Sequence, residues 1–452
     1  MAKTYYIETY GCQMNQYDSL ITGEILENKK LERVLVPDEA DLILINTCSV
    51  RENAHQKVYN RLQNLGHLQR KGAKIGILGC MAQALGESLF EKGLPVNIIA
   101  GPDSLKKILD SQDDQVAYLD KTRDETYEDI IPSIDRHLGI NKDSLNAYVA
   151  IQRGCNNFCT FCVVPFTRGR ERTRSPDSIV QEIKALVDCG MKTITLLGQN
   201  VNSYQHDEIS FTDLVKKILD ETDVKRLYYS SPHPKDFPEE LITLTSQNSR
   251  MGTMVHIPLQ SGSDRILELM KREYTSKEFL RLVDLFRNTI PELSLTTDVI
   301  VGFPGETQSE FEDTLDIMEK SDFDAAFMFS YSERPWTYAS KHYQDDISSD
   351  EKSERLARLI ELQLKRSLKK NRVFENSRVK IMIEGISRRS DSEIIGTTLS
   401  GKKVIAPIPE GTALLSLLGQ EHDVLIQKAT SSTLWGNIVN PQNDNTTEKA
   451  TI

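Results

Sequence analysis

Short apolar runs alternate with amphipathic stretches through the first hundred residues of the 452-residue chain. Apolar runs of this length predict buried β-strands, and apolar positions three and four residues apart predict helices. The expected strands cover residues 5–10, 42–45, 75–78 and 96–100, with helices over 17–28 and 53–68. Nearly continuous apolar strands joined by helices predict a parallel sheet covered on both faces.

The same alternation resumes at residue 147 in six strand and helix units. The strands are expected at 148–152, 193–197, 226–230, 254–257, 295–301 and 325–329, and the helices at 176–187, 214–219, 238–245, 265–270, 276–288 and 308–318. Six such units predict an open partial (β/α) barrel. Its reactive groups are then expected on the loops that follow the strands.

Shorter strands at close spacing follow a predicted helix over residues 353–371. They are expected at 379–383, 394–397, 403–406, 424–428 and 434–439, which predicts a small all-β barrel. The fold class is therefore α/β, with an N-terminal parallel sheet, a central partial barrel and a C-terminal all-β barrel. The expected boundaries are 1–130, a linker at 131–146 within an acidic stretch, 147–372, 373–440, and a disordered polar tail at 441–452.

Composition narrows the class of protein. The chain exceeds what one core normally organises, and 39% hydrophobic with 27% charged residues is typical of soluble domains. The start lacks the apolar region of a signal peptide, and no apolar run is long enough to span a bilayer, so we expect a cytoplasmic protein with no membrane contact. With a net charge of -11, any contact with a nucleic acid must come from a confined basic patch.

Three of the seven cysteines, Cys155, Cys159 and Cys162, follow the first strand of the predicted central barrel in a CxxxCxxC pattern. Thiolates are soft ligands that suit iron–sulfur clusters, and three of them would leave one iron of a four-iron cluster open. A structural zinc site needs a fourth ligand, and none lies nearby. A disulfide is disfavoured because nothing in the chain indicates an oxidising compartment.

Three further cysteines follow separate strands of the N-terminal sheet. Cys12, Cys48 and Cys80 each come directly after an expected strand, next to a small or turn-forming residue. Carboxyl ends of parallel strands share one edge, so these thiols are expected to converge and hold a second cluster. The alternative is that they are ordinary buried cysteines. We assign the seventh, Cys189, to packing, and His233, between two prolines, to a structural role.

Polar and basic residues complete the candidate set. Gln199 and Asn200 follow the strand expected at 193–197, and Asp298 lies in the strand expected at 295–301. They are candidates for binding a ligand through hydrogen bonds or, alternatively, for helix caps and turns. Arginines at alternate positions after the cysteine loop are candidates for binding RNA phosphates, and the alternative for them is a solvent-facing, salt-bridged strand end. Lysines at the basic end of the long helix are further candidates, and the alternative for them is a favourable interaction with the helix dipole. The candidates for RNA binding are Arg168, Arg170, Arg172, Lys369 and Lys370.

The cysteine motifs resemble those of the radical S-adenosylmethionine (SAM) methylthiotransferase family. The resemblance runs over nearly the whole chain, through Tyr10 to Asn15, Asn46 to Arg51, Gly79 to Gln83 and Cys155 to Arg172. It implies a methylthiotransferase N-terminal domain, a radical SAM core and a TRAM RNA-binding domain. The chain departs from the family at Trp336, where members usually have glycine.

The resemblance also implies the chemistry. The core cysteines would hold a [4Fe-4S] cluster whose open iron binds SAM and yields a 5'-deoxyadenosyl radical, with Gln199, Asn200 and Asp298 as SAM contacts. The N-terminal cysteines would hold an auxiliary [4Fe-4S] cluster that carries sulfur, while a second SAM supplies the methyl group.

The residues around Cys48 and Cys155–Cys162 resemble the branch of the family that methylthiolates C2 of N6-isopentenyladenosine beside the tRNA anticodon. The expected partners are a tRNA anticodon stem-loop, an electron donor such as flavodoxin or ferredoxin, and a sulfur source. The alternatives are a threonylcarbamoyl-adenosine tRNA, a ribosomal-protein aspartate, or a non-enzymatic iron–sulfur RNA-binding protein.

Overall fold

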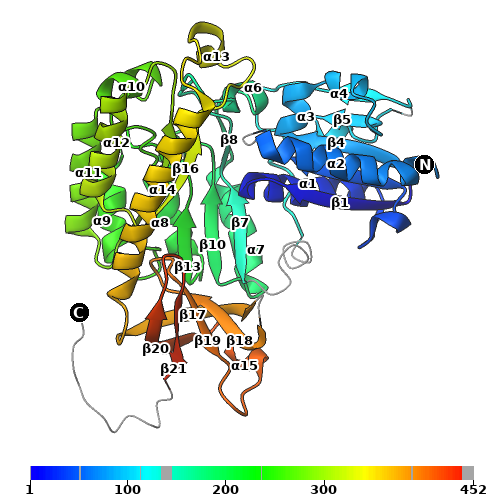
Figure 1. Ribbon diagram of the computed structural model, residues 1–452. Helices are drawn as coiled ribbons and strands as arrows, with labels where there is room; N and C mark the ends of the chain where they lie inside the picture. The colour runs from blue at the N-terminus through cyan, green and yellow to red at the C-terminus, as the bar shows by residue number, and fades with distance from the viewer. Residues whose placement is uncertain are drawn as a thin grey trace.

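The computed structural model describes residues 2–49, 52–111, 113–133, 145–235, 237–387 and 390–439. Figure 1 shows an N-terminal α/β part at the right, a larger strand and helix core at the left, and a small β-barrel below the core. The α/β fold class is confirmed. The predicted tail at 441–452 and most of the predicted linker lie outside the described residues.

The N-terminal part is a six-stranded parallel sheet in the order β2-β1-β3-β4-β5-β6. Helices lie on both of its faces, as the apolar strand pattern requires. Its elements are β1 (Thr4–Tyr10), α1 (Gln13–Asn28), β2 (Glu32–Arg33), η1 (Pro37–Glu39), β3 (Leu42–Thr47), α2 (Glu52–Gln69), β4 (Lys74–Gly79), α3 (Cys80–Leu85), α4 (Ser88–Glu91), β5 (Ile98–Ala100), η2 (Leu105–Lys107) and β6 (Val116–Tyr118).

The strand β6 corrects the prediction for the acidic stretch. The acidic and irregular composition of residues 111–146 predicts a linker or a strap, yet Val116–Tyr118 pairs in parallel with β5 and extends the sheet. Tyr127 and Ile130, further along, are buried in the same core. A three-residue strand has too few alternating positions to signal itself, so pairing with β5 decides its conformation.

The core contains two three-stranded parallel sheets, β13-β10-β7 and β14-β15-β16, joined by a bridge between Leu227 and Met251. The six strands make the open partial barrel predicted from the sequence. Its strands and hairpins are β7 (Asn146–Ala150), β8 (Gln152–Arg153), β9 (Arg172–Thr173), β10 (Thr193–Leu197), β11 (Gln205–His206), β12 (Ile209–Ser210), β13 (Arg226–Tyr229), β14 (Met254–His256), β15 (Ser294–Val301) and β16 (Ala325–Ser330). Its helices are α6 (Val164–Thr167), α7 (Pro176–Asp188), η3 (Val201–Ser203), α8 (Phe211–Glu221), α9 (Glu239–Gln247), α10 (Asp264–Leu269), α11 (Ser276–Thr289), α12 (Gln308–Ser321), α13 (Tyr338–His342) and α14 (Ser349–Arg372).

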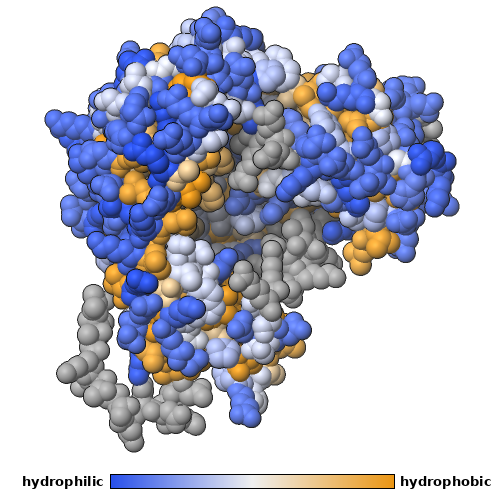
Figure 2. Space-filling view, in the orientation of Figure 1, coloured by the Kyte–Doolittle hydropathy of each residue, from blue (hydrophilic) through white to orange (hydrophobic). Residues whose placement is uncertain are grey.

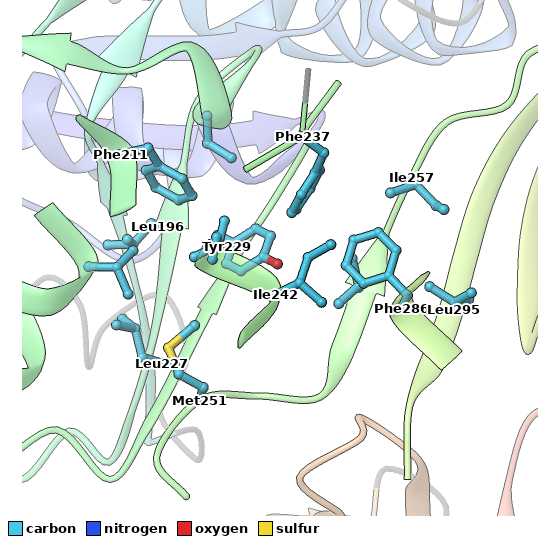
Figure 3. Packing of buried hydrophobic residues seen from close by; sticks show 14 of the residues in the cluster. Leu196, Phe211, Leu227, Tyr229, Phe237, Ile242, Met251, Ile257, Phe286 and Leu295 are labelled. Carbon is cyan, nitrogen blue, oxygen red and sulfur yellow. The ribbon is translucent and has the colours of Figure 1, made fainter. Parts of the chain in front are cut away.

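One continuous hydrophobic core joins the two core sheets to their helices. In Figure 3 the ring of Phe211 meets Tyr229, and Phe237 meets Phe286 with ring centroids 4.9 Å apart in an edge-to-face arrangement. Ile242 of α9 lies between these two aromatic pairs. This packing fixes the strands, and through them the loops at their carboxyl ends.

The C-terminal part is a closed five-stranded barrel, as the spacing of its short strands predicts. Lys402 joins it to the core, with Nζ 2.5 Å from Asp324 Oδ1, and Arg226 Nη2 lies 2.9 Å from Glu421 Oε1. The elements are β17 (Arg378–Ser387), β18 (Ser390–Thr397), β19 (Lys403–Pro407), α15 (Leu414–Leu417), β20 (Glu421–Ala429) and β21 (Leu434–Ile438).

The face seen in Figure 2 is mostly hydrophilic and is hollowed where the N-terminal part, the core and the barrel meet. Among the described residues, no helix is both long enough and apolar enough to cross a membrane.

Candidate metal centre

The core cysteine loop begins at a turn that only glycine can make. Gly154 has φ +76°, and a Cβ at this position would lie 2.1 Å from the carbonyl oxygen of Arg170. The Gly154 N–H donates to Oε1 of Gln199, which closes the turn from the neighbouring strand end. The loop therefore leaves the carboxyl end of the first barrel strand in a fixed direction, at the position where this fold carries its reactive groups.

The backbone of this loop turns toward its own sulfurs. The N–H of Asn157 donates to Cys155 Sγ at 3.5 Å, and the N–H of Val164 donates to Cys162 Sγ at 3.5 Å. Burial, together with the charge of Cys159, raises the pKa of Cys155 to about 11 and that of Cys162 to about 12. Three thiols that raise one another's pKa in this way lie close together, as the CxxxCxxC spacing predicts. A metal would have to displace their protons when it binds.

Arg272 is a site residue that the sequence analysis missed. Its Nη1 donates to Cys159 Sγ at 3.2 Å, its Nη2 donates to the Pro258 carbonyl at 3.2 Å, and the side chain is buried. A fixed positive charge beside a thiolate stabilises the charged form. No local motif marks this arginine, because it lies more than a hundred residues after Cys159 in the sequence.

The second cysteine set also converges, at the edge of the N-terminal sheet. A Cβ at Gly11 would lie 3.0 Å from the Cβ of Cys48, so the loops after β1 and β3 touch. Asn15 joins them, because its Nδ2 donates to Asn46 Oδ1 at 3.1 Å and to the Thr47 carbonyl at 3.2 Å. In the sequence, Asn15 and Asn46 are only the end residues of two cysteine motifs, and the structure shows that they hold the two loops together.

The electrostatics of this second set link it to the core. A hydrogen bond from the Cys48 thiol, together with the positive charge of Arg168, lowers the pKa of Cys12 to about 6. Burial raises the pKa of Cys80, against the same charge of Arg168. Arg168 directly follows α6, which contacts α3, the helix that begins at Cys80 (Figure 1). The two cysteine sets are therefore neighbours across the boundary between the N-terminal part and the core.

Each set offers three thiols. Among the described residues, no three His, Cys, Asp or Glu side chains are grouped as ligands around one metal ion. Thiolates that bind different irons of a four-iron cluster stand further apart than the four ligands of one zinc ion. All seven cysteines are free thiols, so neither set is used in a disulfide.

The prediction that Arg168 and Arg172 bind phosphates is corrected by the structure. Both are buried, and each is paired with a carboxylate of the N-terminal part. Arg168 Nη2 lies 2.7 Å from Asp18 Oδ2, and Arg172 Nη2 lies 2.8 Å from Asp103 Oδ1. Spacing placed these arginines near the clusters but could not show that a second domain covers them.

The remaining candidates for RNA binding also differ in how exposed their side chains are. Lys370 is half-buried and paired with Asp322 and Asp324, whereas Lys369 is exposed. Arg170 is exposed, with its guanidinium 5.2 Å from the centroid of the Phe158 ring beside the core cysteines. Only Arg170 and Lys369 of the five stand where a phosphate could reach them.

Of the three predicted SAM contacts, Gln199 and Asn200 follow β10, and Asp298 lies within β15. Asn200 is buried, and its Oδ1 has no hydrogen-bond partner among the described residues, so it is free to bind a ligand. Gln199 holds Gly154. Asp298 Oδ2 lies 3.2 Å from Nε2 of His256, a histidine that the sequence analysis did not single out.

The structure agrees with the predicted role of His233 and contradicts that of Cys189. Burial lowers the pKa of His233 to about 3, so this histidine is neutral near pH 7 and has the structural character expected of it. Cys189 caps the end of α7 and is exposed, so its assignment to packing was wrong.

Comparisons with known proteins agree with this geometry. The description "Radical SAM superfamily" matches residues 149–318, and "Uncharacterized protein family UPF0004" matches residues 4–101. The tRNA-2-methylthio-N(6)-dimethylallyladenosine synthase of Porphyromonas gingivalis is 40% identical over 448 residues, covering 96% of this chain and 94% of that protein. The chain belongs to this synthase family. The synthase of Bacteroides thetaiotaomicron is 38% identical over 96% of both chains.

Solved structures share the fold at low sequence identity. The radical SAM methyltransferase TsrM from Kitasatospora setae, with cobalamin and a [4Fe-4S] cluster bound, matches with a TM-score of 0.53 at 15% identity over 75% of this chain and 77% of that chain. The cobalamin-dependent radical SAM enzyme OxsB matches with a TM-score of 0.52 at 13% identity, over 78% of this chain and 56% of that chain. The radical SAM core predicted from the cysteine motif is confirmed.

Proposed function

We propose that this enzyme adds a methylthio group to C2 of N6-isopentenyladenosine beside the anticodon of tRNA. The observation that carries the proposal is the pair of three-thiol sets, one on the core and one on the N-terminal sheet, joined by Arg168. Relatives that match both parts over nearly their full length are named for the methylthio product. A base in a single-stranded loop can be splayed out and presented between two such sites.

The residues of the core set fit a [4Fe-4S] cluster with one open iron. Cys155, Cys159 and Cys162 would hold three irons, and Asn200, with its orphaned Oδ1, would contact SAM together with Gln199 and Asp298. When bound, the cluster and SAM supply a carbon-centred radical that can break the strong C2–H bond. Arg272 stabilises the charge on Cys159, and Gln199 holds the turn at Gly154 that aims the loop.

The residues of the N-terminal set fit an auxiliary [4Fe-4S] cluster that carries sulfur. Cys12, Cys48 and Cys80 would be its ligands, and the positive charge of Arg168 favours the thiolate forms of Cys12 and Cys80. Asn15 and Asn46 keep the loops in contact. Since this set is held by residues other than those of the core set, the two tasks can be separated by mutation.

The reaction also needs partners. An electron must reach the core cluster, and a small carrier such as flavodoxin or ferredoxin is suited to deliver it. Sulfur must be restored to the auxiliary cluster from a separate source. For the tRNA, Arg170 beside the core cysteines and Lys369 at the end of α14 are the exposed cations that remain of the predicted set.

The test is to reconstitute the protein with iron and sulfide without oxygen and to supply SAM, a reductant and isopentenylated tRNA. We expect methylthiolated adenosine by mass spectrometry of the digested RNA. Cys159→Ala should abolish SAM cleavage, whereas Cys48→Ala should keep cleavage and lose sulfur insertion. Cys189→Ala, at an exposed cysteine outside both sets, should keep both activities.

Three outcomes would contradict the proposal. Modification of a ribosomal protein alone, or of threonylcarbamoyl-adenosine tRNA alone, would place the chain in another branch of methylthiotransferases. Binding of tRNA without any SAM cleavage would support a non-enzymatic role. Equal loss of cleavage in Cys159→Ala and Cys48→Ala would refute the division of labour between the two sets.

A further inference from the structure

The segment between β16 and α14 places an exposed aromatic surface beside the core cysteine loop. The N–H of Ala339 in α13 donates to the carbonyl of Thr160 at 2.8 Å, and Thr160 lies between Cys159 and Cys162. The Tyr343 hydroxyl donates to the Leu269 carbonyl at 3.4 Å, and Thr160 Oγ1 donates to the same carbonyl at 2.8 Å. Figure 1 shows α13 at the top of the molecule, on the same side as α6. The segment is therefore fixed relative to the proposed radical site.

Two aromatic side chains of this segment, Trp336 and Tyr338, face solvent. Trp336 is 41% exposed, and Tyr338 is 51% exposed and stacks on His342 with ring centroids 4.1 Å apart. Lys341 is also exposed in the same short helix. We call Trp336, Tyr338, Lys341 and His342 the aromatic ledge. None of these side chains contributes to the hydrophobic cores of the described residues.

The backbone at Trp336 is in a conformation that favours glycine. Its φ is +72°, and this left-handed region is disfavoured for any residue with a Cβ. A strained, exposed tryptophan gains little from packing, so the surrounding hydrogen bonds must hold it in place. Strain of this kind tends to persist where a side chain serves a ligand.

An exposed aromatic surface with a cation beside it suits single-stranded nucleic acid. Nucleobases stack on aromatic side chains whatever their sequence, and a lysine can pair with the adjacent phosphate. We infer that the aromatic ledge stacks an unpaired nucleobase of the tRNA anticodon loop next to the adenosine that is modified. This inference rests on the proposed function, and it assigns to the ledge the task of positioning the RNA.

Tryptophan fluorescence can observe this contact directly. The chain has two tryptophans, Trp336 and Trp435, and the second lies in strand β21 of the C-terminal barrel. In a Trp435→Phe protein, the tryptophan fluorescence comes from Trp336 alone. Titration with an isopentenylated anticodon stem-loop should quench its emission, since stacked bases quench indole. The same RNA with abasic sites at the loop positions flanking the adenosine should quench it far less.

Affinity measurements test the contribution of each ring. Trp336→Gly and Tyr338→Ala should each weaken binding of the stem-loop by about five- to hundredfold, the range that corresponds to loss of one stacked base. Trp336→Gly suits the left-handed backbone, so its melting temperature should not fall, which separates binding from folding. Leu35→Ala, at an exposed apolar residue of the N-terminal part, should bind RNA like the wild type. SAM cleavage without RNA should be unchanged in all variants.

The failure of this inference can be told apart from failure of the proposed function. If the wild type methylthiolates tRNA, and Trp336→Gly binds the stem-loop as tightly as the wild type, the ledge does not position the RNA. Absence of quenching in the Trp435→Phe protein would overturn the inference as well. If the wild type is quenched by the RNA, and the variants bind more weakly, but no methylthio product forms, the ledge is supported and the proposed reaction is wrong.

Discussion

The guanidinium of Arg272 illustrates how one residue can act on a cluster that it does not bind. It is buried, donates to Cys159 Sγ at 3.2 Å, and its Nε donates to the Tyr274 hydroxyl at 3.2 Å. Partners that orient a metal ligand are often as important as the ligand itself, and their loss typically weakens metal binding about 10- to 100-fold.

We therefore expect Arg272→Leu to weaken retention of iron at the core site by about 10- to 100-fold, with Arg272→Lys intermediate. The measurement is iron per protein after competition with a chelator. It is made in a Cys12→Ala, Cys48→Ala, Cys80→Ala background, so that only the core site is counted. Arg281→Ala, at an exposed arginine of α11, should retain iron like the parent protein. Equal iron retention in Arg272→Leu would show that the arginine is not needed there.

At the scale of single residues, burial was the property that the sequence left open. Arg168 and Arg170 are two positions apart, yet one is buried against Asp18 and the other is exposed beside Phe158. An arginine that binds a phosphate and an arginine in a buried ion pair can stand at the same spacing in a sequence, so the sequence does not distinguish them. Contact with the N-terminal part decides between them, because it covers Arg168 at the end of α6 and leaves Arg170 in the following turn exposed.

Among the helices, α12 depends on a carboxylate at its first turn. Glu310 accepts from the Thr307 N–H at 2.8 Å in a capping box, and Arg265 of α10 donates to both of its oxygens at 2.7 Å. These hydrogen bonds, the one from Arg265 foremost, lower the pKa of Glu310 to about 2. The Glu310 carboxylate thus joins the first turns of α10 and α12.

This pKa predicts how the stability depends on pH. Because the folded pKa lies below the ordinary value of 4.5, the contribution of Glu310 is fully present above about pH 4.5 and is lost as the pH falls toward about 2. Glu310→Gln should lower the urea midpoint at pH 7, and its difference from wild type should shrink between pH 4.5 and 3. Glu319→Gln, at an exposed position of the same helix, should show little difference at either pH. A pH-independent difference in Glu310→Gln would contradict the prediction.

Long elements were predicted well, and very short ones were not. The predicted strand at 193–197 is the observed β10, and the predicted barrel strands appear with shifts of a few residues, because apolar runs are a local property. The strands β6, β8 and β9 have two or three residues each. At that length only the hydrogen bonds to a partner strand determine the conformation.

On the scale of the whole molecule, buried ion pairs join the N-terminal part to the core. Asp18 of α1 meets both Arg153 and Arg168, at 2.6 and 2.7 Å. Beside it, the Tyr17 hydroxyl donates to Glu182 of α7 at 3.0 Å. Burial raises the pKa of Asp18, but the two guanidiniums outweigh it and the net shift is downward, so the carboxylate is charged.

Asp18→Ala should therefore leave the buried guanidinium of Arg168 without its carboxylate partner, and that of Arg153 with Glu125 alone, whose Oε1 lies 3.3 Å from Arg153 Nε. Loss of one partner from such a pair typically costs about 3–5 kcal/mol. We expect a lower free energy of unfolding in urea and faster proteolysis between the two parts. Asp316→Ala, which breaks an exposed pair with Lys320, should cost less than about 1 kcal/mol. Wild-type stability of Asp18→Ala would show that the domains are held together by other contacts.

The sequence by itself determined the three-part α/β architecture, the two cysteine sets and the family. The reason is that apolar periodicity and cysteine spacing are local properties of the sequence. Tertiary structure decided which arginines are buried, that Arg272 reaches Cys159, and that the two cysteine sets meet across a domain boundary at Arg168. The physical reason is that these outcomes depend on contacts between residues far apart in sequence. Those contacts form only when packing brings the domains together.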